Sequence, residues 1–462
     1  MNISTYKHKW IVAILLSAAF ISILNQTLLM IAMPPIMADF QIDANQAQWL
    51  TTIYLLTNGI LIPITAYLIG RFSNRMLLLT GLVLFSVGTL TGGFAPNFMT
   101  LLLARVIQAG GAGIIMPMMQ TIIITIYPKE KRGTIMGIAG LVTGFAPAVG
   151  PTLAGWLIEQ FSWRYLFYTM FPISIIIILI VAFYMRNVTE KQQGQLDVLS
   201  VVYSSFGWGG LLYAFSIAGS KGFDNLEVWI PLGIGTISLW QFIQRQLKLE
   251  KPILEFRVFQ SKIFTLSTIL SFLVYSLMVG SQILLTFYMQ NVRELTALET
   301  GLMLLPGALV MGIFSPIAGK IFDRLGGRLL AIAGFSLILG GNIAFIFLSY
   351  HSTILYISTI FSFISLGITM VMMPLTTAGM NALPIRLIAH GTAVNNTLRM
   401  VAGAIITALL VTIMSSTSSF YHDLSMNQAM LNGIRAAFMT ASLLSLGGFI
   451  IALLYKNPIK NT

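Results

Sequence analysis

The chain has 462 residues, of which 56% are hydrophobic and only 9% are charged, and it contains no cysteine. This composition is typical of a membrane-spanning protein, and no polar segment is long enough to form a soluble domain. The lack of cysteine excludes disulfides, thiol catalysis and cysteine-ligated metals. The formal net charge of +12 has to be interpreted from the positions of the basic residues.

Apolar stretches long enough to cross the roughly 30 Å hydrocarbon core of a bilayer follow one another along the whole chain. A retained first span is expected, because the first stretch is too long for a signal peptide and has no small-residue cleavage site. We predict an all-α integral membrane fold with fourteen spans, at residues 10–33, 47–70, 76–94, 98–122, 134–156, 163–185, 197–219, 227–247, 262–288, 298–321, 328–349, 353–376, 392–416 and 433–456.

The basic residues predict the orientation of these spans. With a cytoplasmic N-terminus, the termini and the even-numbered connections carry twenty Lys and Arg residues. The outer connections carry three: Arg164, Lys221 and Arg293. This bias places both termini in the cytoplasm of a cell whose plasma membrane holds the protein. The net charge therefore reflects topology and contact with anionic membrane lipids, and we expect no nucleic-acid partner.

The first span contains two adjacent amides, Asn25 and Gln26, in the segment LNQTLLMIAMP (residues 24–34). Amides at bilayer depth need a partner on another helix or access to water. They either hold helices together or face a central cavity. Tyr54 and Asn58 of the second span are further candidates for the cavity lining.

An arginine lies inside the fourth span, in RVIQAGGAG (residues 105–113). An ionisable residue within the membrane is a functional candidate, although a structural arginine that bonds helix carbonyls is the alternative. We expect Arg105 to face the central cavity, close to Gln108 and held by amides such as Asn25 or Gln26.

The fifth span contains GFAPAVGPTLAGW (residues 144–156), which combines two prolines with closely spaced small residues. Prolines remove backbone donors and kink a helix, and small residues let a partner helix approach closely. This pattern predicts a hinge or a gate at the outer end. Its residues are Pro147, Gly150, Pro151 and Gly155.

Two halves of the chain repeat each other. The segment GRFSNR (70–75) corresponds to GKIFDRLGGR (319–328), and Pro117 near the end of the fourth span corresponds to Pro374. Such a repeat is typical of transporters built from two six-helix units. We predict a six-helix bundle at 1–190, two inserted helices with a basic amphipathic segment at 191–261, and a second six-helix bundle at 262–462.

The second half adds further candidates. Asp323, Arg324 and Arg328 form either a cytoplasmic latch held by charge pairs or a solvated turn that follows the positive-inside rule. Tyr275, Gln282 and Asn395 lie within spans and could line the cavity. Twenty-five methionines and 11% aromatic residues suit an adaptable apolar cavity.

Together these segments resemble the major facilitator superfamily, and within it the fourteen-span drug:proton antiporters of bacteria. The resemblance runs from about Leu24 to Leu454 and includes the stretch GMNALPIRLIAHGTAVNNTLR (379–399). It implies two pseudo-symmetric bundles, alternating access, and a proton or sodium gradient as the driving force in place of any cofactor or metal.

The chain departs from the family pattern at two positions. The family usually has Asp where this chain has Asn25, and another Asp where it has Gly70. Asn resembles a protonated Asp in shape but carries no proton. A proton carrier would have to lie elsewhere, for example at Asp39, Asp43, Glu159, Glu294, Glu299 or Asp323.

The sequence thus predicts a secondary active exporter of small amphipathic compounds, including drugs, which works as a monomer and is not an enzyme. One alternative is an exporter of an anionic or zwitterionic lipid-like metabolite, because Arg105 has no mid-span carboxylate to pair with. A non-transporting membrane sensor is another, although no signalling domain is attached to the spans.

Overall fold

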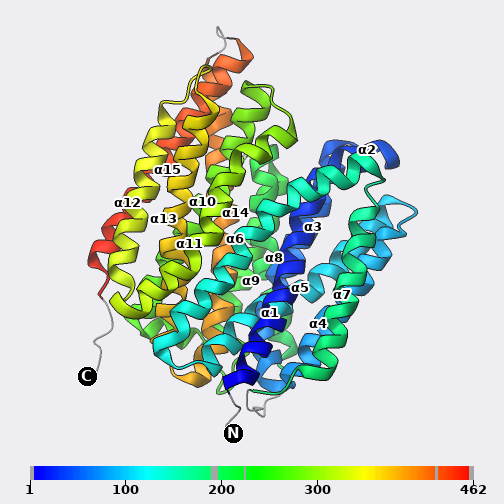
Figure 1. The fold of residues 1–462 in the computed structure, drawn as a ribbon, viewed down its shortest axis with the longest axis vertical. Coiled ribbons are helices and arrows are strands. Elements are labelled where there is room, and N and C mark those ends of the chain that lie inside the picture. Colours follow the sequence, from blue (N-terminus) through cyan, green and yellow to red (C-terminus); the bar gives the residue numbers. More distant parts are fainter. Residues whose placement is uncertain (1–4, 189–195, 223–224, 422–424, 457–462) are drawn as a thin grey trace.

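A computed structural model gives the fold, and it describes residues 5–188, 196–222, 225–421 and 425–456. Within these ranges nearly all residues are helical (Figure 1). The α-helices are α1 (Thr5–Ile31), α2 (Met33–Phe40), α3 (Ala44–Arg71), α4 (Asn74–Gly93), α5 (Phe98–Ile126), α6 (Lys129–Gln160), α7 (Tyr165–Tyr184), α8 (Val198–Lys221), α9 (Leu226–Lys248), α10 (Lys262–Phe287), α11 (Ala297–Leu325), α12 (Gly327–Ile346), α13 (Ile354–Asn381), α14 (Ile388–Phe420) and α15 (Met426–Leu454).

The long helices correspond one by one to the predicted spans. In the described part of the chain, thirteen helices are long and apolar enough to cross a membrane. The remaining long helix, α6, has 32 residues and carries the glycine- and proline-rich pattern of the fifth predicted span. The start of α1 and the end of α15 lie at the same end of the molecule, as an even number of crossings requires (Figure 1). We call this the inner end and the opposite one the outer end.

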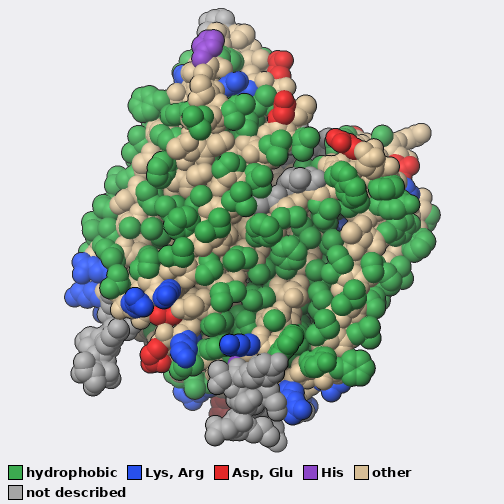
Figure 2. All heavy atoms as spheres, viewed as in Figure 1, with side chains coloured by type: hydrophobic (Ala, Val, Ile, Leu, Met, Phe, Trp, Pro, Cys, Tyr) green, Lys and Arg blue, Asp and Glu red, His purple; other side chains and the backbone are tan. Residues whose placement is uncertain are grey.

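The surface fits a bilayer. Figure 2 shows apolar side chains over the middle of one face, while Lys and Arg gather mainly towards the inner end. Large side chains such as Leu103 (56% exposed) and Ile313 (62% exposed) project from the long helices. A continuous surface of such large apolar side chains suits contact with lipid tails.

The first helix ends earlier than the predicted span. The prediction continued to residue 33, but α1 ends at Ile31 and a separate short helix, α2, begins at Met33. Pro34 and Pro35 lie in the first turn of α2, where a missing backbone donor is tolerated. They therefore start a new helix at the outer end.

The helices form two groups that meet along two seams. We call α1 and α3–α7 the first bundle and α10–α15 the second bundle. Helix α6 of the first packs along α11 of the second, and α3 packs against α14. The additional pair α8 and α9 joins this assembly because α8 packs against both α3 and α14. The two seams frame the centre of the molecule (Figure 1).

Glycines explain how closely α6 and α11 approach. A Cβ placed on Gly133 would lie 2.7 Å from the carbonyl oxygen of Gly319, and one on Gly137 would lie 2.5 Å from that of Ser315. Any larger side chain would force the helices apart. The seam therefore depends on small residues of α6 that the fifth predicted span supplies.

Candidate functional site

The first bundle encloses the guanidinium of Arg105. This side chain from α5 is 1% exposed. Its Nη1 donates to Oδ1 of Asn25 on α1 and to Oε1 of Gln108, each at 2.8 Å, and its Nε donates to the Leu50 carbonyl of α3 at 3.3 Å. The guanidinium carbon also lies 4.2 Å from the centre of the Tyr54 ring. Neutral acceptors and one aromatic face thus surround the cation.

Further hydrogen bonds extend this cluster to α4. Nε2 of Gln108 donates to Oγ1 of Thr89 at 2.9 Å, and the Tyr54 hydroxyl donates to the Ser22 carbonyl at 3.4 Å. Close packing of α4 on α5 depends on Gly88, whose Cβ would lie 2.6 Å from the Gln108 backbone nitrogen. The cluster therefore connects α1, α3, α4 and α5.

The expected contact between Arg105 and Asn25 is present, and the arginine is 1% exposed. Gln26 and Asn58 are half-buried and stand outside the described hydrogen bonds of Arg105. Gln108 contributes as a direct acceptor. The geometry shows a satisfied cation that holds four helices together, which favours the structural reading of Arg105 within the first bundle.

The second bundle contains a polar cluster between α10 and α14. Nδ2 of Asn395 donates to Oγ1 of Thr268 at 3.4 Å, and the guanidinium carbon of Arg399 lies 4.8 Å from the centre of the Tyr275 ring. Tyr275 and Asn395 thus take part in contacts between the same two helices, whereas Gln282 of α10 is exposed. Sequence reasoning missed Arg399, although its position inside the span 392–416 was a usable signal.

Hydrogen bonds join the two bundles near the inner end. The carboxylate of Asp323 accepts from the backbone nitrogens of Gly133 and Thr134 at 2.8 and 2.7 Å, and from the Thr134 hydroxyl at 2.6 Å. We call these three residues the inner latch. An Asp at this place also suits the positive N-terminal end of α6. Asp323 in this latch accepts from two backbone amides and one hydroxyl at the start of α6. A contribution of charge pairs from Arg324 or Arg328 stays a prediction.

Two more bonds cross between the bundles. Nη1 of Arg132 donates to Oδ1 of Asn381 at 2.7 Å, and Nδ2 of Asn396 donates to Oε1 of Gln120 at 2.8 Å. Asp323 and Arg324 belong to the last turn of α11, and Arg328 donates to the Leu453 carbonyl of α15 at 3.2 Å. The inner ends of the bundles are therefore closed against each other.

The proline-rich part of α6 contacts α1 of its own bundle and α11 of the second bundle. Gly150 packs against Thr27 of α1, and Gly155 lies 3.9 Å from the Leu298 side chain of α11 when given a Cβ. Pro147 is half-buried within an unbroken helix. The side chain of Pro151 lies outside the described part of the structure. Small residues at these positions permit both contacts.

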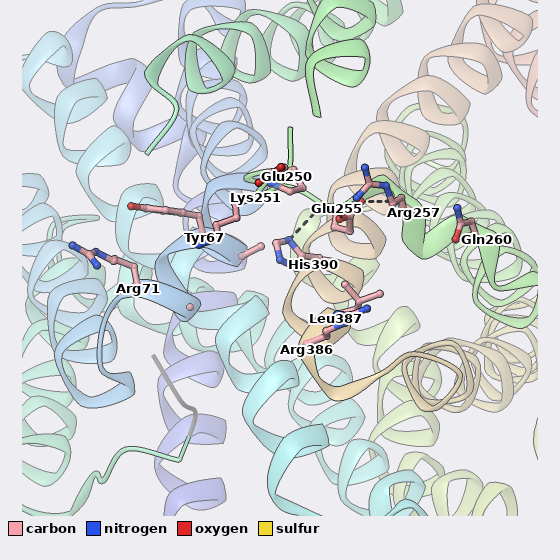
Figure 3. Close-up of a pocket in the computed structure, with 13 residues that line it drawn as sticks. Tyr67, Arg71, Glu250, Lys251, Glu255, Arg257, Gln260, Arg386, Leu387 and His390 are labelled. Atoms are coloured by element: carbon pink, nitrogen blue, oxygen red, sulfur yellow. Dashed lines mark hydrogen bonds and ion pairs between the residues drawn. The ribbon is translucent and has the colours of Figure 1, made fainter. Parts of the chain in front are cut away.

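A pocket of about 630 Å³ opens at the inner end (Figure 3). Its walls come from the end of α3, from residues 250–260 and from the start of α14. The Glu255 backbone nitrogen donates to Nδ1 of His390 at 3.3 Å, so the segment after α9 is held against the second bundle. The predicted basic amphipathic segment therefore lies at the junction of both bundles and the additional pair.

The arrangement of two bundles around a central seam agrees with comparisons of sequence and fold. A model of the Major Facilitator Superfamily matches residues 15–407. The chain belongs to the Major Facilitator Superfamily. A human organic anion transporter, MFSD10, has the same fold, with a TM-score of 0.69 at 13% identity over 96% of this chain and 99% of its own. The all-α membrane fold predicted from the sequence is confirmed.

Several bacterial relatives are similar over nearly their full length. An uncharacterized transporter of this superfamily from Bacillus subtilis, YcnB, is 54% identical over 97% of this chain and 95% of its own. The lincomycin resistance protein LmrB of Listeria monocytogenes is 38% identical over 96% of each chain. The multidrug export protein EmrB of Haemophilus influenzae is 26% identical over 94% and 89%. The resemblance to the drug:proton antiporter branch is thereby confirmed.

Proposed function

We propose that this transporter of the superfamily is a secondary active exporter of amphipathic compounds, including drugs, in the plasma membrane of a bacterium. The observation that carries the proposal is the closure of the two bundles at the inner end by the latch of Asp323, Gly133 and Thr134. An exporter must break such contacts to admit cargo from the cytoplasm and form them again to release it outside. The relatives named for lincomycin resistance and multidrug export support the cargo class.

Coupling to an ion gradient is a second part of the proposal. Asn25 occupies the position where the family usually has Asp, and its Oδ1 accepts directly from Arg105 at 2.8 Å. An amide cannot release a proton, so we expect export to depend weakly on the proton gradient. In Asn25→Asp the nearby Arg105 favours the ionised form of the new carboxyl group, while burial favours its neutral form. Because this carboxyl group can bind and release a proton, we expect flux to depend more strongly on the proton gradient.

The test is efflux from proteoliposomes that hold the purified protein. Ethidium, lincomycin and the zwitterion rhodamine B are loaded, and flux is compared with no gradient, an imposed proton gradient and an imposed sodium gradient. Gradient-driven efflux of any of these compounds supports the exporter. Absence of flux under every condition contradicts it. Strong proton dependence in the unmodified protein contradicts the role given to Asn25 and assigns the proton to a carboxylate near a helix end, such as Asp39 or Glu159.

A further inference from the structure

A second buried arginine lies within a predicted span and has no polar partner in the described parts of the chain. Arg399 of α14 is 7% exposed, and its Nε has no hydrogen-bond partner among the described residues. The Tyr275 ring, 4.8 Å from the guanidinium carbon, is its described contact with an electron-rich group. A cation in a low-dielectric interior is costly unless it is paired, so this guanidinium has unused capacity for an anion.

Two other arginines inside predicted spans, Arg105 and Arg435, differ in this respect. Arg105 donates to three acceptors inside the first bundle. Arg435 of α15 donates through Nε to the Leu348 carbonyl at 2.8 Å. Both have structural partners on neighbouring helices. No ion pair involving Arg399 occurs in the described parts of the chain. Packing of the second bundle therefore does not account for its charge.

Polar groups on the same faces of α10 and α14 accompany Arg399. Asn395 lies one helical turn before it, and Ser271 lies one turn before Tyr275. Ser271 is fully buried, and its hydroxyl has no partner among the described residues. Its O–H is a second donor without an acceptor in this region. Oδ1 of Asn395 is in turn a buried acceptor without a partner among the described residues. The two unsatisfied donors and the Tyr275 ring form one half-built site beside this amide.

The position of Arg399 fits a transport pathway. It lies eleven residues after the start of α14 at Ile388, which is about 16 Å along the helix and close to the bilayer midplane. Asn396, on nearly the same side of α14, bonds to Gln120 of the first bundle. Helix α14 also packs against α3 and α5. Cargo sites of secondary transporters lie at this depth between the repeats.

We propose that Arg399, Tyr275 and Ser271 form an anion-binding subsite that takes the carboxylate, or a similar anionic group, of an amphipathic cargo. The guanidinium and the Ser271 hydroxyl donate to the anionic group, and the Tyr275 ring holds the guanidinium in place. This inference rests on the proposed export function and narrows its cargo to compounds with an anionic group, including zwitterions. The adaptable apolar remainder of the cargo contacts the surrounding helices.

The experiment measures equilibrium binding, so it does not depend on flux. The purified protein in lipid nanodiscs is titrated with rhodamine B and with rhodamine B ethyl ester, which differ in whether the carboxylate is free. We expect the unmodified protein to bind the free acid more tightly by a factor on the order of ten to a hundred. Arg399→Gln should remove this preference by weakening the acid and leaving the ester unchanged, and Arg399→Lys should retain part of it.

A control is Arg435→Gln, which removes a half-buried arginine of the second bundle and should leave the preference intact. The proposal is overturned if the unmodified protein shows no preference for the acid, or if Arg399→Gln weakens both dyes alike.

Failure of this proposal can be told apart from failure of the export function. Loss of the acid preference in nanodiscs, together with gradient-driven efflux from proteoliposomes, removes the subsite and leaves the exporter. An acid preference that depends on Arg399 without any efflux leaves the subsite and removes the exporter.

Discussion

The inner latch leads to a quantitative prediction about the balance between inner-closed and inner-open states. Asp323 accepts three hydrogen bonds from Gly133 and Thr134 at 2.6–2.8 Å. A hydrogen bond to a charged group contributes about 1.5–3 kcal/mol net. Asp323 is half-buried and regains water when the bundles separate, so the three bonds together should contribute less than their sum. We take the contribution of the latch to the inner-closed state as about 2–3 kcal/mol. Its loss then changes the ratio of the inner-open to the inner-closed state by roughly 30- to 150-fold.

Two substitutions test this. Asp323→Ala removes all three acceptor contacts, and Asp323→Asn keeps an oxygen for Gly133 but turns an NH₂ group towards Thr134. Both variants should shift the population towards the inner-open state, and the alanine variant should shift it further. The assay is the distance distribution between spin labels on Lys129→Cys and Lys320→Cys. These two exposed positions lie on α6 and α11, and the native chain has no cysteine to interfere.

The control is Asp43→Asn. Asp43 also accepts from a helix amide, that of Gln46 at 2.7 Å, but within the outer end of the first bundle. This variant should leave the inner distance unchanged. Identical distance distributions in the unmodified protein, Asp323→Ala and Asp323→Asn would refute the reasoning, because the latch would then contribute nothing to closure.

Three further predictions concern other parts of the molecule. Arg105→Ala should leave two buried amide acceptors unpaired and lower the free energy of unfolding by about 2–6 kcal/mol. It should also abolish transport, and full flux in vesicles that hold this variant would contradict the prediction. The hydrogen bond from Arg164 lowers the pKa of Asp39, so this pair stabilises the folded protein above the ordinary Asp pKa of 3.8, and its contribution is lost as the pH falls through the lowered value. The difference in Tm between the unmodified protein and Arg164→Gln should therefore shrink on acidification and stay constant near neutral pH. A single cysteine at Lys131 should resist an impermeant maleimide in intact cells and react in inverted vesicles, and the opposite pattern would reverse the orientation.

Sequence patterns were sufficient for the fold because the bilayer imposes local rules. Spans such as 76–94 and 98–122 were found within a few residues of α4 and α5, since each backbone amide must be satisfied inside its own helix. The ends of the helices were less precise. Helix α1 ends at Ile31, after which Pro34 and Pro35 begin α2, and α15 begins at Met426, seven residues before the predicted span 433–456.

The sequence by itself determined that Arg105 is intramembrane and close to amides, because these facts depend on position along helices. Only the tertiary structure decided that Asn25 and Gln108 accept from Arg105 and that Asp323 bonds to amides of α6. It also showed that Nε of Arg399 has no hydrogen-bond partner among the described residues. The physical reason is that burial and hydrogen bonding of a side chain depend on helices distant in sequence. Positions 133 and 323 are 190 residues apart, and no local pattern specifies which helix face meets which.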